Sequence, residues 1–441
     1  MKRVLFILIF LAILPESEFE FGQFWTPLRI ATEILEWRGL KLPVFDICII
    51  LLSLSSRRVR LGRNRAMEKA LWLSCGAMLV WSLWGVAHGG SAYQIQFQLY
   101  GRIFNLIVSF ALAKMLTTRD DFYALGKVVF AAAMYRAGLC IVKYLATVLP
   151  GGEPPFVCTT HEDSVLFVTG IVIIIVYLIE RRGKMSKAAI VGFALAILAI
   201  LTAIQFNNRR LAWVSLVASL LLIYFFLPKS EIKTRINRRL LILAPVVALY
   251  VIVGTGRPEK IFAPLKSLSS VNDSTDASTK SRDAENMGLL VTLMPNPFMG
   301  TGWGKEYIEV DATYSAGASI FVQYKYMPHN SVLALLAFTG CLGFASHWAM
   351  LPLCVFLNGR AHRLATNPRT RMIAMFSVCE MVIFINQAWG DLGFFAKVPQ
   401  LMMAMAVASA IRIPSIAATE GDSRAVRTPK RRVSMSSRVS P

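Results

Sequence analysis

Charged residues are scarce in this chain of 441 residues. They make up 17% of the sequence, whereas about 25% is usual for a soluble domain. Hydrophobic residues make up 55%, and the mean hydropathy is +0.54. This balance excludes an intrinsically disordered protein, because such chains lack the apolar surface that a folded core requires. It indicates a protein embedded in a membrane.

Cysteine and acidic residues are also few. The seven cysteines are scattered singly and form no CxxC pair, which argues against both a disulfide framework and a zinc site. Asp and Glu number 26 against 47 Lys and Arg, so the formal charge is +21. In a soluble protein this excess would suggest a nucleic-acid partner. In a membrane protein the positions of the basic residues have to be considered first.

Long apolar runs recur along the whole chain. A helix that crosses a bilayer needs about 20 mainly apolar residues. Twelve segments are candidates: 1–14, 42–56, 66–88, 93–113, 125–149, 164–180, 186–206, 210–228, 239–255, 330–357, 370–388 and 393–413. The predicted fold class is therefore an all-α integral membrane protein with about 12 transmembrane helices and one long extracytoplasmic loop before the tenth.

The first two candidate segments are short. Segment 1–14 begins with Lys2 and Arg3 and has the look of a signal peptide, but no small-x-small cleavage site precedes Pro15, which favours a retained anchor. Segment 42–56 spans only about 22 Å as a helix, so it is expected to gain length from its flanks.

Basic residues predict the orientation. When the twelve segments alternate from a cytoplasmic N-terminus, Lys and Arg concentrate in the cytoplasmic loops, as the positive-inside tendency requires. The predicted organisation is helices 1–9 in 1–255, an extracytoplasmic loop in 256–328, helices 10–12 in 329–413 and a basic, disordered cytoplasmic tail in 414–441. The positive charge then reflects topology, and no nucleic-acid partner is expected.

The long outer loop contains two local patterns. Gly300-Thr-Gly-Trp-Gly304 resembles a phosphate-binding loop only weakly, because it lacks a GKS or GKT end and a preceding strand. A turn built by glycine is the alternative. In 283–294, the apolar residues have helical spacing, which predicts a short amphipathic helix along the membrane surface: Met287, Leu290, Val291 and Met294.

Cations on the outer side are the most informative residues. Arg209 and Arg210 occupy a short outer turn, Arg282 lies in the long loop, and His329 precedes Asn330 and Ser331 at the start of a helix. Taken singly, the arginines could contact lipid phosphates and the histidine could simply begin a helix. Together they suit a pyrophosphate leaving group, which guanidinium groups bind bidentately, and a hydroxyl that a neutral histidine deprotonates.

Other polar residues lie in or beside the apolar segments. Arg102 is near the outer end of its segment, where a phosphate contact is possible, and Arg136 is expected to pair with Asp46 or Glu380. His161-Glu-Asp163 lies on another outer turn. It offers a second base or acid, or else a solvated turn whose Asp163 caps the next helix.

These motifs resemble the superfamily of O-antigen ligases and O-antigen polymerases, which are polytopic glycosyltransferases. Arg209-Arg-Leu-Ala-Trp213 is similar to the family's outer Thr-Arg-Gly-Ala-Trp turn and places the family arginine at Arg210. Arg282 followed by Pro295-Asn-Pro and the glycine run is similar to a second pattern. His329-Asn-Ser-Val-Leu333 with Gly340-Cys-Leu-Gly343 is similar to a third. Leu211 replaces the usual glycine and Arg209 the usual threonine, so the order of the two arginines stays open.

The resemblance implies a GT-C-like, metal-independent enzyme without a cofactor, in the bacterial inner membrane with its active site facing the periplasm. The donor would be a glycan on undecaprenyl pyrophosphate. Arg210 and Arg282 would hold the pyrophosphate, with Arg209 and Arg102 as further candidates. His329 would activate the acceptor hydroxyl. Residues with a supporting role would be Asn330, Ser331, Gly302 and Gly304.

Four functional alternatives stay open. A ligase transfers the glycan to the lipid A core, whereas an O-antigen or exopolysaccharide polymerase transfers it to another lipid-linked repeat unit. Protein-O-glycosylating relatives share the chemistry. The Arg-x-Ala-Trp turn favours the ligase. A transporter of lipid-linked sugars is a different class, for which the deep cations Arg136 and Lys143 are the main support.

Overall fold

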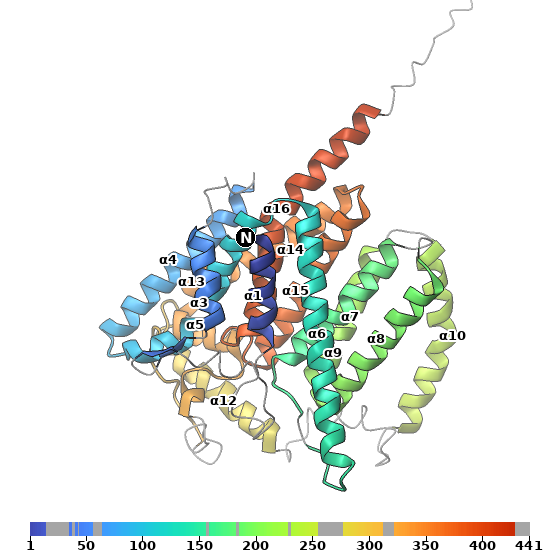
Figure 1. The fold of residues 1–441 in the computed structure, drawn as a ribbon. Helices are drawn as coiled ribbons and strands as arrows, with labels where there is room; N and C mark the ends of the chain where they lie inside the picture. Colours follow the sequence, from blue (N-terminus) through green and yellow to red (C-terminus); the bar gives the residue numbers. More distant parts are fainter. Residues whose placement is uncertain are drawn as a thin grey trace, which may run out of the picture.

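The computed structural model describes residues 1–14, 35–37, 40–42, 44–55, 64–155, 158–181, 185–227, 231–254, 277–311 and 322–427. The predicted loop residues 256–276 and the last part of the tail, 428–441, lie outside the described residues. Helices dominate in Figure 1, and the strands β1 (Leu35–Trp37) and β2 (Leu40–Leu42) form one small antiparallel hairpin. The helices are α1 (Lys2–Ile13), α3 (Val44–Ser55), α4 (Arg65–Ala87), α5 (Ala92–Met115), α6 (Arg119–Val148), α7 (Asp163–Glu180), α8 (Lys187–Phe206), α9 (Arg210–Phe226), α10 (Glu231–Gly254), α12 (Ala277–Leu293), the 3-10 helix η5 (Val322–Lys325), α13 (Ser331–Trp348), α14 (Met350–Leu364), α15 (Pro368–Gly390) and α16 (Lys397–Arg427).

Each of the twelve predicted segments overlaps a helix. Within the described residues, nine helices are long and apolar enough to cross a membrane, with α13 and α14 counted as one. The other three predicted segments form α1, α3 and α9, which have 12, 12 and 17 residues. The chain is therefore a multi-pass membrane protein, but the count of twelve spans stays a prediction. The second segment gains no helical length on its N-terminal side, because Leu42 belongs to strand β2 and α3 begins at Val44.

Polar caps mark where several helices begin. Thr118 and Asp121 form a reciprocal capping box at the start of α6, and Ser186 accepts a hydrogen bond from the amide of Ala189 at the start of α8. The side chain of Asn367 accepts from the amide of Arg369, ahead of Pro368 at the first position of α15. These short polar turns separate the apolar helices.

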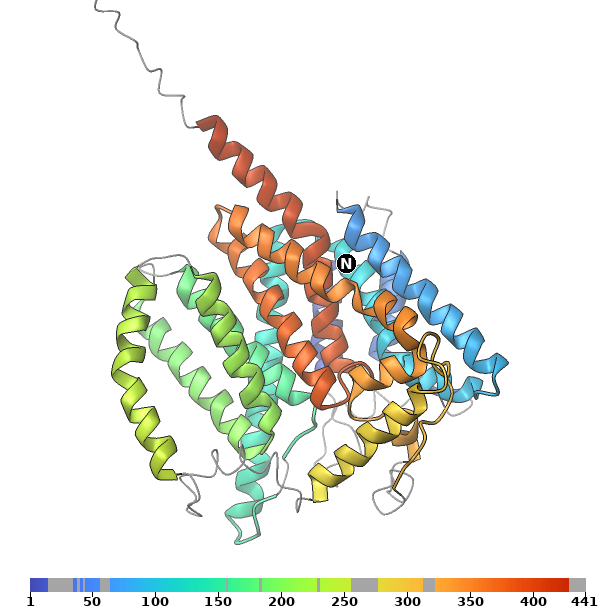
Figure 2. The same ribbon diagram turned by 180° about the vertical axis from the view of Figure 1, so that it is seen from behind.

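The helices pack around α15 and α16, whose apolar residues are mostly buried. In Figures 1 and 2, α4 lies at one side of the bundle and α8, α9 and α10 lie at the other. Leu241 and Ile252 of α10 are 78% and 74% exposed, as expected of side chains that face lipid. Helix α12 lies across one end of the bundle, and α16 projects from the opposite end.

The end from which α16 projects carries many ion pairs, and we refer to it as the basic end. Arg119 pairs with Glu420 at 3.0 Å and Arg371 pairs with Glu180 at 2.9 Å. Glu420 also accepts hydrogen bonds from Thr370 and from the amide of Asn367. Glu420 lies beyond residue 413, where disorder was predicted. The first part of the tail is helical instead, because α16 continues to Arg427.

Arg136 has a different partner from the one expected. Its guanidinium binds the carboxylate of Asp163 at 2.6 Å and donates to the carbonyl of Leu14 at 3.2 Å. The predicted pairing with Asp46 or Glu380 is wrong. Asp46 pairs with Lys397 at 2.7 Å and Glu380 accepts from Thr169 at 2.9 Å. A buried charge requires such a partner, since water is excluded around it.

Helix α13 is interrupted at Gly340, whose backbone has φ 58° and ψ −173°. The segment 297–304 seals the break. The carbonyl of Ala337 accepts from the amide of Thr301, and the carbonyl of Phe338 accepts from the amide of Gly302 at 2.8 Å. Beyond the break, the amides of Cys341 and Leu342 donate to Pro297 and Phe298. Backbone groups freed inside a membrane need such partners, because lipid offers none.

The same segment is held by α4 and α5. The indole nitrogens of Trp81 and Trp84 donate to the carbonyls of Met299 and Gly300. Gln98 accepts from the amide of Gly304 at 2.5 Å. Gly302 and Gly304 have φ of 86° and 87°, and a Cβ at either would collide with the backbone of α4 or of the turn after it. The glycine run is thus a tightly packed turn.

We predict that Gly302→Ala destabilises the protein by about 1–3 kcal/mol, because the new methyl group meets the backbone of Gly85 and the positive φ disfavours a side chain. Thermal unfolding in detergent measures the loss. Gly76→Ala on α4 is the control, since its Cβ would have no atom within 4 Å. Equal melting temperatures for Gly302→Ala and the wild type would contradict the tight packing of this turn.

Candidate functional site

Several polar side chains meet at the end of the bundle opposite the basic end. They come from the turn before α7, the start of α9, the end of α15, the helix α12 and the start of α13. Three of these elements, α7, α9 and α13, direct their N-termini to this end. A helix N-terminus carries partial positive charge and unpaired amides, so this end of the bundle suits an anion.

His161 links two of the elements. Its Nδ1 lies 2.9 Å from a carboxylate oxygen of Asp391, and its Nε2 lies 3.1 Å from the guanidinium of Arg209. Because a guanidinium can only donate, this contact makes Nε2 an acceptor, and Nδ1 carries the proton that faces Asp391. His161 therefore does not lie on a freely solvated turn, which was the simpler of its two predicted roles.

The turn that carries His161 is held at three successive residues. His161 contacts Asp391 after α15, Glu162 accepts from the amide of Val398 in α16 at 2.6 Å, and Asp163 binds Arg136 of α6. Asp163 therefore serves as an ion-pair partner and does not cap α7, which begins without a side-chain cap. The position of His161 is thus fixed by three different helices.

Asp391 follows directly on the end of α15. Burial alone would raise the pKa of its carboxyl, but the hydrogen bond from His161 and the electrostatic attraction of His161, His329 and Arg282 lower it to about 2. The carboxylate is therefore ionised at neutral pH and faces the protonated Nδ1 of His161. Its backbone carbonyl accepts from the hydroxyl of Ser331 at 2.9 Å, which ties the start of α13 to the same point.

His329 is oriented by Glu285 of α12. Its Nδ1 lies 2.9 Å from one oxygen of the Glu285 carboxylate, and the other oxygen accepts from the amide of Asn330 at 3.1 Å. The ring of Tyr324 lies against His329 with a centroid distance of 4.7 Å. The side chain of His329 is 23% exposed, whereas that of Glu285 is 8% exposed. Because the Glu285 carboxylate faces Nδ1, the other ring nitrogen, Nε2, is available to accept a proton, as in the Asp–His pair of a catalytic triad.

Arg282 lies on α12 as well, three residues before Glu285. Positions separated by three residues share one face of a helix. The guanidinium of Arg282 donates to the carbonyl of Gly390, next to Asp391. The predicted helix in 283–294 is confirmed by α12, on which Met287 is 53% exposed; Met294 directly follows the helix and is 70% exposed.

Not all of the predicted site residues gather here. Arg209 contacts His161, whereas the side chain of Arg210 is exposed at the first residue of α9. Asn330 caps α13 by accepting from the amide of Leu333. Arg102 is only 3% exposed and donates to the carbonyl of His347 at 3.1 Å, in a separate buried cluster. Gly302 and Gly304 lie in the segment that seals α13.

Glu285 and Asp391 were not identified from the sequence. Glu285 could have been identified, because it follows Arg282 by three residues at the start of a predicted helix and therefore shares a helix face with it. Asp391 had none, since one acidic residue after an apolar segment is a common feature of a membrane protein. Among the described residues, no three His, Cys, Asp or Glu side chains are grouped as metal ligands.

Comparison with known proteins identifies one related family. Residues 195–347 match the family model of the O-antigen ligase. The match includes Arg209, Arg282 and His329, whereas His161 and Asp391 lie outside it. It confirms the predicted resemblance to the superfamily of O-antigen ligases and polymerases and supports a function of that type in polysaccharide synthesis. No curated protein matches the chain.

We predict that Asp391→Asn lowers the free energy of unfolding by about 2 kcal/mol at pH 7, because a carboxyl whose pKa falls from 3.8 to about 2 on folding stabilises the folded state. This contribution is present above pH 4 and is lost as the pH falls towards 2. Thermal unfolding at pH 7 and at pH 3 should show a smaller difference between variant and wild type at the lower pH.

The exposed Asp283 of α12 provides a matched control for this measurement. Asp283→Asn should leave the melting temperature unchanged at both pH values. A difference between Asp391→Asn and the wild type that is as large at pH 3 as at pH 7 would disprove the ionic role of Asp391.

Proposed function

We propose that the chain is a membrane glycosyltransferase of the O-antigen ligase type. It would transfer a glycan from undecaprenyl pyrophosphate to a sugar hydroxyl in the synthesis of lipopolysaccharide or another surface polysaccharide. The observation that carries the proposal is the pair of His329 and Glu285, with Arg282 one helical turn away on the same helix. A candidate base and a candidate phosphate ligand thus come from neighbouring elements in the region that matches the family.

The pyrophosphate of the donor would bind to the arginines. Arg282 already lies beside Asp391, and Arg209 lies on the other side of His161. Guanidinium groups bind two phosphate oxygens at once and stay charged as the leaving group departs. The N-termini of α7, α9 and α13 add partial positive charge in the same place. The proposed donor site therefore combines Arg209 and Arg282 across His161.

The acceptor hydroxyl would be activated by His329. As its oxygen attacks the anomeric carbon, the proton passes to Nε2 of His329 and the bond between that carbon and the pyrophosphate oxygen breaks. Attack from the face opposite the pyrophosphate inverts the anomeric configuration. Glu285 would act as a positioning residue, because its carboxylate holds Nδ1 and stabilises the imidazolium that forms.

Arg102 is proposed as an indirect contributor. Its guanidinium lies 4.9 Å from the ring centroid of Phe394, in the turn between α15 and α16 that also contains Asp391. A buried arginine at this place would stabilise the turn rather than contact the donor. Arg136, on which the transporter alternative partly rested, is bound to Asp163.

The acceptor distinguishes a ligase from a polymerase. We favour the ligase on the Arg-x-Ala-Trp sequence at 210–213, with which α9 begins, and keep the polymerase as the alternative. The site would face the periplasm of a bacterial inner membrane, with both termini in the cytoplasm, as the positions of the basic residues predict.

We predict that His329→Ala lowers glycan transfer by a factor of about 100 or more, because a positioned general base contributes 10²–10⁴-fold. The measurement is a glycan gel of cells that lack the gene and are complemented with each variant. Long polymer left on its lipid carrier would indicate a ligase, and products stalled at one repeat unit would indicate a polymerase.

The exposed His88, which follows α4, is the matched control. His88→Ala should restore the wild-type pattern. Full complementation by His329→Ala would eliminate this residue as the base and would strengthen the transporter alternative.

We also predict different effects for the two adjacent arginines. Both Arg209→Lys and Arg210→Lys replace a planar guanidinium group, which can bind two phosphate oxygens at once, by a compact ammonium group. A bidentate phosphate site tolerates this change poorly. The resemblance assigns the pyrophosphate to Arg210, but the contact with His161 favours Arg209, so Arg209→Lys should lose the larger share of activity. The same glycan gel ranks them. Near-normal transfer in Arg209→Lys together with loss in Arg210→Lys would return the role to Arg210.

A further inference from the structure

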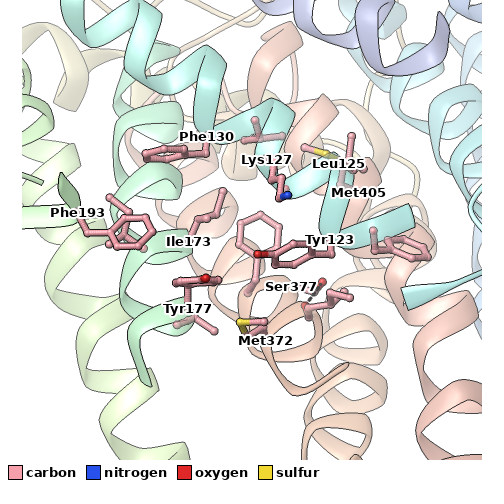
Figure 3. Close-up of a pocket in the computed structure, with 17 residues that line it drawn as sticks. Tyr123, Leu125, Lys127, Phe130, Ile173, Tyr177, Phe193, Met372, Ser377 and Met405 are labelled. Atoms are coloured by element: carbon pink, nitrogen blue, oxygen red, sulfur yellow. Dashed lines mark hydrogen bonds between the residues drawn. The ribbon is translucent and has the colours of Figure 1, made fainter. Parts of the chain in front are cut away.

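A cavity of about 390 Å³ lies between α6, α7 and α15, with α8 and α16 contributing one side chain each. This volume is within the range of about 300–1,000 Å³ that is typical of small-molecule sites. Its walls are mainly aliphatic and aromatic. Half-buried rings of Phe130, Tyr177, Phe193 and Phe376 line it, so the cavity reaches the surface of the bundle. Figure 3 shows the first three of these rings at the cavity.

The cavity lies near the basic end. Its α6 side chains belong to residues 122–130, which are the first turns of α6, within about 16 Å of where that helix begins. Its α7 side chains end at Tyr177, close to the end of that helix, and those of α15 begin at Met372. Asp391 follows the other end of α15, and Arg209 and His329 precede α9 and α13 at that same end of the bundle. This cavity is therefore separate from the candidate active site.

Cations and tyrosines surround the part of the cavity nearest the basic end. Lys127 lines it, is exposed, and has its ammonium 5.0 Å from the ring centroid of Tyr123. The guanidinium of Arg181 lies 5.8 Å from the ring centroid of Tyr177. Among the described residues, no carboxylate pairs with Lys127 or Arg181. Arg369 also lies over Tyr123, but it pairs with Asp120.

We propose that this cavity binds an acyl chain of an anionic phospholipid, whose phosphate is held by Lys127 and Arg181. An apolar cavity that opens beside cations within a membrane protein has the two features that such a lipid requires, an aliphatic tail and a negative headgroup. Tyrosines at this level fit the boundary between acyl chains and headgroups. The proposal does not depend on the proposed transferase function.

The donor lipid is a less suitable occupant. Its pyrophosphate would lie at the other end of the bundle, beside Arg209 and Arg282. A phospholipid in the leaflet at the basic end can place its phosphate at Lys127 and its acyl chain in the cavity, because the two are adjacent. The charge and the position of the cavity therefore favour a phospholipid of that leaflet.

Gly126 allows the cavity to be filled without disturbing the helix. It lines the cavity, and a Cβ built on it has no neighbouring atom within 4 Å. Gly126→Leu should therefore occupy the space that the acyl chain needs. Gly138 lies on the same helix, also has open space at its Cβ, and does not line the cavity, so Gly138→Leu is the matched control.

The test is native mass spectrometry of the purified, delipidated full-length protein titrated with dioleoyl phosphatidylglycerol or dioleoyl phosphatidylcholine. We expect one phosphatidylglycerol to bind at least tenfold more tightly than phosphatidylcholine. Gly126→Leu should weaken this binding at least tenfold, and Gly138→Leu should leave it unchanged. Lys127→Gln should remove most of the preference for phosphatidylglycerol.

Three results would overturn the proposal. Equal binding in Gly126→Leu and the wild type would show that the lipid does not enter this cavity. Equal affinities for the two phospholipids would eliminate the anionic headgroup. Displacement of phosphatidylglycerol by an equal concentration of undecaprenyl phosphate would assign the cavity to the polyprenyl chain of the donor.

Discussion

Inside a bilayer a polar group has only the protein as its partner, and the break in α13 makes this constraint decisive. The backbone groups released at Gly340 are taken up by segment 297–304, which is fastened in turn to Trp81 and Trp84. That segment follows α12 after three residues. The seal therefore also fixes the end of α12 over the start of α13, and it is this placement that brings Arg282 and Glu285 of α12 to His329. The glycine run contributes to the site through the position of α12.

The same constraint organises the other half of the site. Asp163 neutralises Arg136 inside the bundle, and this ion pair holds the start of α7 against α6. His161, two residues earlier, is thereby presented to Asp391 and Arg209. Breaking a buried ion pair by removing one partner costs about 3–5 kcal/mol. A pair that belongs to the core thus also fixes the geometry of the polar cluster at the end of the bundle.

Much of this arrangement could be predicted from the sequence, and the remainder has a common cause. The length of the apolar runs located the helices, and their amphipathic spacing located α12, because both signals are local. The motifs around Arg209, Arg282 and His329 indicated the family. The pairing of Arg136 with Asp163 instead of Asp46 or Glu380 depends on which helices are neighbours, which no local pattern reveals. Asp391 was missed for the same reason, since its partner His161 comes from a distant turn. Contacts between helices distant in the sequence require the packing itself.

The charges at the site can be compared with those of the proposed donor. Arg209 and Arg282 carry two positive charges, and the N-termini of α7, α9 and α13 add about half a charge each. Asp391 and Glu285 carry two negative charges, but Glu285 is directed at His329 and Asp391 at His161. The acids therefore fix the histidines. The two guanidinium groups and the helix N-termini remain as the positive groups that a pyrophosphate diester, with its two negative charges, would meet. Negative charge increases on the leaving group as the glycosidic bond breaks. Positive groups that are already in position would therefore bind the transition state more strongly than the intact donor lipid, which is the condition for catalysis.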